Sequence, residues 1–343
     1  MLIDNILIVG NPESFHVGAH FFKAAKKLGL RTEIKDVRNA FYGSRLLQSA
    51  LWRFCGRRPQ RLESFGKDVV ANCIAGGYSI LLAIGIAPLD YHSLSRLRKE
   101  GVQTLNYLTD DPWNNAHYAP WFLRALPQYD VVFSTRNSNL ADLKKIECPR
   151  ISYCPFGYNR DSHSLVPDFP SDMDGPEIMF VGGADADRKK ILKPLLKNGF
   201  RLALYGGYWS NFREFSQFSC GNAELSTLAR KGQDSKITLC LVRRANRDGH
   251  VMRTFEAAAS GGCMLVEDTE EHRHIFGNDG DCVVYFGNDS EMVSKAKWLL
   301  NHPDERFRLR QAVYKRIVLD GQNTYQDRLK TILELARKSG QNS

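Results

Sequence analysis

The order of apolar and polar positions in the first half of the chain predicts alternating strands and helices. Short continuous apolar runs, typical of strands buried on both faces of a parallel sheet, are separated by segments whose apolar residues recur at helical spacing. The predicted strands are 6–9, 32–36, 80–86, 104–108 and 131–134, and the predicted helices are 16–28, 66–75, 91–99 and 138–145. This alternation is typical of a parallel sheet covered by helices on both faces.

The same alternation begins again after residues 159–176, a polar stretch rich in proline and aspartate that we interpret as a linker. Here the predicted strands are 177–181, 201–205, 237–242, 263–267 and 283–286, and the predicted helices are 188–197, 252–260, 290–301 and 303–338. The pattern therefore predicts an α/β protein with two Rossmann-like domains, residues 1–165 and 175–315, hinged near residue 170. Ligand sites in such sheets lie at the carboxyl ends of the strands, so we expect the site in a cleft that the two domains face.

Composition narrows the class of protein. With 343 residues, 43% hydrophobic and 25% charged, the chain is too long for one ordinary core and too apolar to be disordered. Lysine and arginine (47) exceed aspartate and glutamate (38) by 9, which indicates an anionic partner such as a nucleotide, a phospholipid surface or nucleic acid. No helix-turn-helix, zinc finger or ribonucleoprotein motif is present, and we predict no nucleic-acid partner.

The cysteines and the N-terminus predict a cytoplasmic protein. The eight cysteines are scattered without a Cys-x-x-Cys pair, which favours reduced, mostly buried thiols over disulfides or zinc, and no secretory signal is visible. Residues 69–89 carry no charge and are long enough for a membrane span, but Gly76-Gly77 divides them, and we favour a helix, a turn and a buried strand.

Residues 45–61 combine five arginines with Trp52 and Phe54. Two interpretations stay open for them. A basic amphipathic helix of this kind can lie on an anionic membrane, as a peripheral contact at the inner face of the cell membrane, or grip a lipid-linked acceptor. Alternatively, its apolar stripe lies in the core and its arginines in water.

The most informative stretch is 243–268, where a loop leads from one buried strand into a short helix, a glycine pair and another strand. Arg253 and Glu256, three residues apart, project from one face of that helix. Free N–H groups and Arg253 can meet a phosphate, while the carboxylate accepts from ribose hydroxyls. The alternative is an intrahelical salt bridge on a solvated face.

Asp248, Glu256 eight residues later and the string 257–268 resemble the Glu-x7-Glu segment of retaining glycosyltransferases of the GT-B fold. The fuller pattern, 252–268 followed by His272 and 275–277, is similar to the glycosyltransferase group 1 domain of CgeB-like spore-maturation proteins. The resemblance extends over about residues 177–330. It implies that a C-terminal helix, residues 316–338, crosses back to pack on the N-terminal domain.

The resemblance also implies a donor site for a nucleotide sugar. Glu256 would bind the ribose, Arg253 would lie near the diphosphate, and Asp248, an aspartate where the family has glutamate, would contact the donor sugar. The basic run Arg188, Lys189 and Lys190, after the first strand of the second domain, would neutralise the leaving diphosphate without a metal. The alternative for this run is a solvated helix face. Tyr205 lies where the base would be enclosed, although a turn with core aromatics explains 205–209 as well. The remaining predicted donor-binding residues are Gly183 and His250.

The N-terminal domain is expected to hold the acceptor. Asp110 and Asp111 follow a predicted strand, where paired acids can orient or deprotonate a hydroxyl. They also resemble an Asp-Asp-Pro element of the CgeB-like family; a metal-binding pair and an aspartate-capped turn are the alternatives. His16 is a candidate base or a helix N-terminal residue with no catalytic meaning.

Together these observations predict a glycosyltransferase that moves a sugar from a nucleotide sugar to a hydroxyl of a saccharide or lipid-linked acceptor. We expect retention of configuration, no metal, no cofactor, and a role in cell envelope polysaccharide. Two alternatives stay open: a sugar-nucleotide epimerase, and a non-catalytic nucleotide-binding or membrane-docked scaffold with the same fold.

Overall fold

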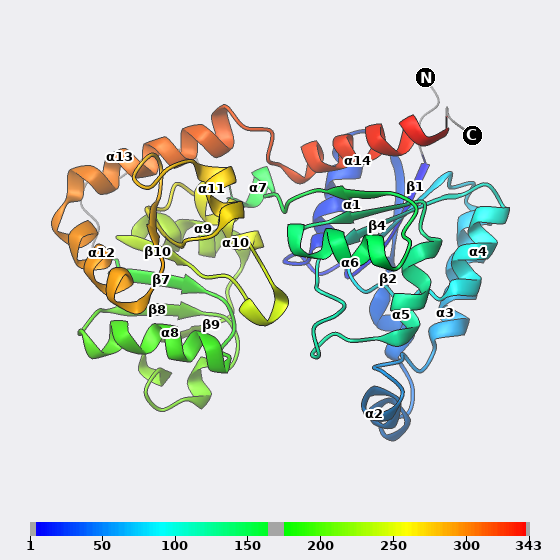
Figure 1. The fold of residues 1–343 in the computed structure, drawn as a ribbon, viewed down its shortest axis with the longest axis horizontal. Helices are drawn as coiled ribbons and strands as arrows, with labels where there is room; N and C mark the ends of the chain where they lie inside the picture. Colours follow the sequence, from blue (N-terminus) through cyan, green and yellow to red (C-terminus); the bar gives the residue numbers. More distant parts are fainter. Residues whose placement is uncertain (1–4, 164–174, 341–343) are drawn as a thin grey trace. The chain divides into compact units, whose positions relative to one another are not determined.

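A computed structural model describes residues 5–163 and 175–340 of the chain. These residues form two compact units, each with its own sheet (Figure 1). The first unit contains residues up to Pro155, the short segment Arg244–Asp248 and the C-terminal residues from Tyr325; the second contains Phe156–Arg243 and Gly249–Thr324. The predicted domain boundary between residues 165 and 175, with its hinge near 170, falls almost entirely on residues 164–174, which lie outside the described residues.

The sheet of the first unit is parallel, with strand order β2-β1-β3-β4-β5-β6. Its strands are β1 (Asn5–Gly10), β2 (Arg31–Asp36), β3 (Ile80–Ile84), β4 (Gln103–Leu108), β5 (Val131–Ser134) and β6 (Ile151–Tyr153). Its helices are α1 (Val17–Lys27), α2 (Arg45–Phe54), α3 (Leu62–Ala75), α4 (Tyr91–Lys99), α5 (Pro120–Ala125), α6 (Leu140–Lys145) and α14 (Tyr325–Gly340). The five strands predicted from apolar runs are all present. The residues of β1, β3, β4 and β5 are almost wholly buried in the middle of the sheet, whereas β2 is a half-buried edge strand.

The uncharged stretch 69–89 forms a helix and a strand, as predicted. Helix α3 ends at Ala75, Gly77 adopts a left-handed conformation (φ 61°), and β3 begins at Ile80. In the described part of the chain, none of the helices has the length and apolar character needed to cross a membrane.

The sheet of the second unit is also parallel, in the order β12-β11-β10-β7-β8-β9. Its strands are β7 (Ile178–Val181), β8 (Leu202–Tyr205), β9 (Ser219–Gly221), β10 (Ile237–Cys240), β11 (Met264–Glu267) and β12 (Val284–Phe286). Its helices are α7 (Arg160–His163), α8 (Ala186–Lys197), α9 (Leu225–Asp234), α10 (Met252–Ala259), α11 (Glu270–Phe276), α12 (Asp289–Asn301) and α13 (Pro303–Tyr314). Their apolar side chains form one core around β7, β8 and β10.

The predicted helix 303–338 is wrong in one respect, because it is interrupted. Helix α13 ends at Tyr314, a π-helical turn spans Lys315–Leu319, and α14 begins only at Tyr325. A Cβ on Gly321 would lie 2.7 Å from the carbonyl oxygen of Arg316, so the chain turns where only glycine fits. The predicted return of the C-terminal helix is confirmed: α14 belongs to the first unit, where Tyr325 stacks on His20 (ring centroids 4.9 Å apart).

Two segments belong to a different unit from the one that the sequence pattern predicts for them. Residues 156–163, predicted to end the first domain, belong to the second unit, where α7 packs against α9 and α10. Residues 244–248 belong to the first unit although the chain on either side belongs to the second. Both assignments affect the predicted site.

Candidate functional site

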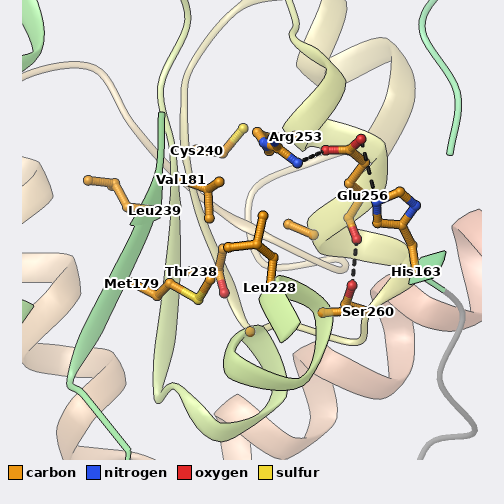
Figure 2. A pocket seen from close by; sticks show the side chains of 13 residues that line it. His163, Met179, Val181, Leu228, Thr238, Leu239, Cys240, Arg253, Glu256 and Ser260 are labelled. Atoms are coloured by element: carbon orange, nitrogen blue, oxygen red, sulfur yellow. Dashed lines mark hydrogen bonds and ion pairs between the residues drawn. The ribbon is translucent and has the colours of Figure 1, made fainter. Parts of the chain in front are cut away.

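A small cavity lies in the second unit, below the carboxyl ends of β7 and β10 (Figure 2). Its volume is about 30 Å³, the size of a water molecule. Most of its wall is apolar; the charged side chains and the imidazole that reach it come from α7 and α10, and the hydroxyls come from Thr238 on β10 and from Ser260, which follows α10. The lining residues are His163, Met179, Val181, Leu228, Ala229, Gly232, Thr238, Leu239, Cys240, Arg253, Glu256, Ala257 and Ser260.

Arg253 and Glu256 are joined at this cavity. The guanidinium of Arg253 donates a hydrogen bond to Oε2 of Glu256, and Figure 2 shows the two groups pointing toward each other. Glu256 is only 2% exposed, and its Oε1 lies 3.5 Å from Nε2 of His163. The intrahelical salt bridge is therefore present, but its carboxylate is buried beside basic groups instead of lying on a solvated face.

His163 is a site residue that the sequence analysis missed. It lies in α7, inside the stretch 159–176 that we interpreted as a linker, and it is buried. A four-residue helix has no apolar periodicity to reveal it, and no motif surrounds it.

His250 is held by protein groups on both sides of its ring. Nε2 accepts a hydrogen bond from the backbone N–H of Phe156 (3.1 Å), so Nδ1 carries the proton and donates to Oε2 of Glu271 (2.6 Å). A Cβ on the preceding Gly249 would lie 2.4 Å from the Glu271 carboxyl carbon, which makes glycine necessary there. In this structure His250 thus anchors the loop that leads into α10.

Asp248 lies in the first unit, and Glu256 lies in the second. The Asp248 carboxylate accepts hydrogen bonds from Nε of Arg136 and from Nδ2 of Asn246 (3.1 Å). The side chains of Asp248 and Arg136 are 3% and 2% exposed. Arg136 was not among the predicted site residues. It follows β5 at the carboxyl edge of the sheet, and this position could have identified it as a candidate.

Asp111 is the centre of a second buried cluster in the first unit. Arg247 binds both of its oxygens (2.6 and 2.9 Å), and Asn139 and the Trp113 N–H donate to the same carboxylate (3.0 Å each). Burial raises the pKa of Asp111, but these hydrogen bonds outweigh it and hold the pKa below its ordinary value. The arrangement matches the aspartate-capped turn that was one alternative for this residue.

Asp110 and His16 are more accessible than Asp111. Thr109 donates to Oδ2 of Asp110 (3.1 Å), and Oδ1 of Asp110 lies 3.8 Å from Nε2 of His117. His16 precedes α1 and makes no capping hydrogen bond with its side chain. Partial burial and Arg38 lower the pKa of His16, while Glu13 and Asp110 oppose the shift. Both residues lie at the carboxyl edge of the first sheet, as predicted.

The glycine loops after β7 and β8 bring three of the predicted donor-binding residues together. The Arg188 guanidinium donates to the carbonyl oxygen of Gly183 (2.8 Å), while its backbone N–H donates to Oδ1 of Asp185, the N-cap of α8 (2.8 Å). Tyr205 ends β8 beside this loop, and burial raises the pKa of its phenol to about 12. Lys190 is exposed on α8, and Lys189 lies 3.7 Å from the centroid of the Phe212 ring.

Residues 188–334 match the sequence profile of the family described as Glycosyl transferase-like. No curated protein matches the sequence. Three solved structures illustrate the likeness of the fold. Sucrose-phosphate synthase from Thermosynechococcus elongatus is 13% identical with a TM-score of 0.71, covering 99% of this chain and 100% of its own. A glycosyltransferase from Rickettsia africae is 15% identical with a TM-score of 0.66, covering 99% and 100%. A structure described as trehalose-6-phosphate from E. coli bound with UDP-2-fluoro glucose is 12% identical with a TM-score of 0.61, covering 97% and 99%.

The fold is GT-B. Two parallel six-stranded sheets with their helices, and the return of the C-terminal helix, agree with the predicted fold class. The family match over residues 188–334 also confirms the prediction of a glycosyltransferase enzyme. It spans most of the segment, about residues 177–330, over which we noted the resemblance.

Within this GT-B chain the predicted residues form three separate groups. Arg253 and Glu256 share the cavity of the second unit, and Gly183, Arg188 and Tyr205 share its glycine loops. The three predicted aspartates, Asp110, Asp111 and Asp248, lie in the first unit. Among residues 5–163 and 175–340, no set of three or more His, Cys, Asp or Glu side chains is arranged to hold a metal ion.

Proposed function

We propose that this GT-B glycosyltransferase moves a sugar from a nucleotide-sugar donor to a hydroxyl group of a saccharide or lipid-linked acceptor. The observation that carries the proposal is the pair formed by the half-buried Arg253 and the buried Glu256 on α10, in the segment that matches the family. The E. coli structure of the same fold is described as bound with UDP-2-fluoro glucose, which supports a donor of this class.

The donor chemistry follows from the charges of the second unit. Glu256 accepts from the ribose hydroxyls, and the guanidinium of Arg253 binds the diphosphate by charge-assisted hydrogen bonds. As the bond between the donor sugar and its diphosphate breaks, negative charge grows on the leaving nucleoside diphosphate. Arg253, Arg188 and Lys190 stabilise that charge, so the transfer proceeds without a metal.

The acceptor chemistry follows from the first unit. Asp111 is committed to Arg247, whereas Asp110 keeps an accessible carboxylate that orients or deprotonates the acceptor hydroxyl. His16, whose pKa is lowered, is neutral and able to accept a proton. We also propose that the protein belongs to the CgeB-like subfamily and transfers the sugar with retention of configuration. Its proposed role is in the cytoplasm, on cell envelope polysaccharide.

A peripheral contact with the inner face of an anionic cell membrane is part of the proposal. It is supported by the excess of 9 positive charges and by the basic helix α2.

The proposal is tested by a screen of nucleotide sugars for release of the nucleoside diphosphate, with a chelator present. Glu256→Ala removes the ribose acceptor, and donor affinity is expected to fall roughly tenfold to a hundredfold because a hydrogen bond to a charged group is lost. Titration calorimetry with the donor measures this change. Glu334→Ala, on the exposed side of α14, is the matched control.

Full turnover by Glu256→Ala would contradict the assignment. Donor binding without diphosphate release, in the presence of a range of acceptors, would favour the scaffold alternative, and a new sugar nucleotide formed without acceptor would favour the epimerase.

A further inference from the structure

Helix α2 presents its apolar stripe to solvent. Leu46, Leu47, Ala50, Leu51 and Phe54 share one face at helical spacing. Leu46 is 85% exposed, Phe54 is 84% exposed, and α2 has no buried residue. In Figure 1 this helix, in dark blue, projects from the rest of its unit.

The polar side of the same helix attaches it to the unit. Nε2 of Gln48 donates to the carbonyl oxygen of Arg58 (3.3 Å), and its Oε1 accepts from the N–H of Gln60 (2.9 Å). Trp52, beside Gln48 on this face, packs near Phe41 and Arg57. The usual orientation of a surface helix is therefore reversed, and one of the two interpretations of residues 45–61, an apolar stripe in the core, is wrong.

The segment that contains α2 is strongly basic, although Glu63, just beyond it, pairs with Arg58 (2.7 Å). Residues 37–62 contain six arginines and no acidic residue. Three of the arginines, Arg45, Arg53 and Arg61, are exposed and make no ion pair with any residue that the structure describes. Arg53 borders the apolar stripe, where it can reach groups lying beside it, and Arg45 lies in the first turn on the side of Gln48 and Trp52.

We propose that α2 docks on an anionic phospholipid membrane. The apolar stripe enters the boundary between headgroups and acyl chains, and the arginines bind lipid phosphates. A second copy of the chain fits this surface poorly, because its α2 would bring the same unpaired arginines against these. The inference deepens the peripheral contact of the proposed function, and because docking needs no turnover, it can fail while the transferase assignment stands.

The first experiment measures co-sedimentation of the full chain with vesicles. We expect the chain to bind vesicles that are one-third phosphatidylglycerol and two-thirds phosphatidylcholine, and not vesicles of phosphatidylcholine alone. Replacing Leu46 and Phe54 together by alanine is expected to weaken binding at least about tenfold, since burial of their apolar surface drives insertion. Both side chains are exposed, so thermal unfolding should not change. Leu319→Ala, at a side chain 66% exposed in the second unit, is the control.

A second set of variants tests how much positive charge contributes to vesicle binding. Replacing Arg45, Arg53 and Arg61 by glutamine is expected to weaken binding more than tenfold, at about a factor of five for each arginine. A variant with the same loss of charge elsewhere, at the exposed Lys67, Lys197 and Lys330, should retain most of the binding.

Two exposed cysteines locate the contact. Cys55 directly follows α2, and Cys220 lies in the second unit, while the other six thiols are buried. An environment-sensitive fluorophore on Cys55, in a Cys220→Ser background, is expected to shift its emission to the blue with anionic vesicles. The same fluorophore on Cys220, in a Cys55→Ser background, should not respond.

Three results would overturn the proposal. One is no binding to either kind of vesicle. Another is binding that the α2 variants leave unchanged, and the third is a dimer that the Leu46 and Phe54 changes dissociate while vesicles bind nothing.

Discussion

At the scale of single residues, most of the charged side chains predicted to perform chemistry are paired with other protein groups. Asp111 is bound by Arg247, Asp248 by Arg136, and Glu256 by Arg253. A buried carboxylate without its partner is costly, so such pairs respond strongly when one member is removed. Their roles can therefore be separated by combining stability measurements with donor binding.

Arg136→Ala is expected to lower the free energy of unfolding by about 3–5 kcal/mol, because the buried Asp248 carboxylate loses its guanidinium. Urea unfolding followed by circular dichroism measures the change. The control is Arg98→Ala, whose ion pair with Asp130 is 3.4 Å long and largely solvated, with an expected loss under about 1 kcal/mol. Equal losses in the two variants would contradict this interpretation.

His272 predicts a pH dependence of stability. Burial lowers its pKa from 6.5 to about 4, with the carbonyl of Glu267 opposing the shift. The unfolded chain therefore takes up a proton on this imidazole at higher pH than the folded chain. The contribution to stability is complete above about pH 6.5 and is lost as the pH falls from there to about 4.

His272→Gln is expected to flatten this pH dependence in urea unfolding. His274→Gln, at an exposed imidazole on the same helix, is the control for removing one histidine. If His272→Gln and the unmodified chain lose stability equally between pH 6.5 and pH 4, the assignment to His272 is wrong.

At the scale of elements, the loops at the carboxyl ends of strands position the candidate donor residues. The loop from β10 to α10 is held by His250 and Glu271, and the loops after β7 and β8 pack backbone against backbone at Gly182 and Gly206. Gly206 has φ 122°, a conformation that side chains disfavour. The glycines are thus requirements of loop geometry.

Gly206→Ala is expected to lower the free energy of unfolding by about 1–3 kcal/mol and to weaken donor binding. Its Cβ would lie 2.6 Å from the carbonyl carbon of Gly182, so the Gly183 loop must shift. Gly207→Ala is the matched control, because nothing lies within 4 Å of its Cβ. Urea unfolding and calorimetry with the donor check both, and unchanged values for Gly206→Ala would refute the geometric argument.

At the scale of the whole molecule, the chain does not divide into two consecutive halves. The first unit is completed by 244–248 and by α14, which come from far along the sequence. Helix α14 packs on α1, and Nε2 of Gln103 donates to the carbonyl oxygen of Ala336 (2.9 Å). A first domain cut at residue 165 would lack both segments.

Ile332→Ala tests the dependence of the first unit on α14. Ile332 is fully buried, and its truncation is expected to cost about 2–5 kcal/mol of unfolding free energy. Cleavage of α14 by limited proteolysis should also accelerate. Lys330→Ala, at an exposed position of the same helix, should change stability by less than about 0.5 kcal/mol. Unchanged resistance of Ile332→Ala to proteolysis would show that the docking of α14 does not depend on Ile332.

The sequence by itself determined most of the elements and the fold class. The strand 131–134 and the helix 91–99 have the predicted bounds, and other predicted strands differ by one or two residues, because apolar periodicity is a local property of the chain. It missed short elements such as α7 and β9, which have too few residues for a period, and also the ten-residue helix α9, in which apolar residues are few. It failed again at Gly321, where the turn interrupts an otherwise helical pattern.

Only the tertiary structure decided the partners of the charged side chains and the direction of α2. Asp111 and Arg247 are 136 residues apart, and nothing in either local sequence selects the other. The pattern of α2 shows that it has an apolar face, but which face meets the unit depends on where Gln60 and Arg58 lie. Periodicity records the faces of an element, whereas packing between distant segments determines what each face meets.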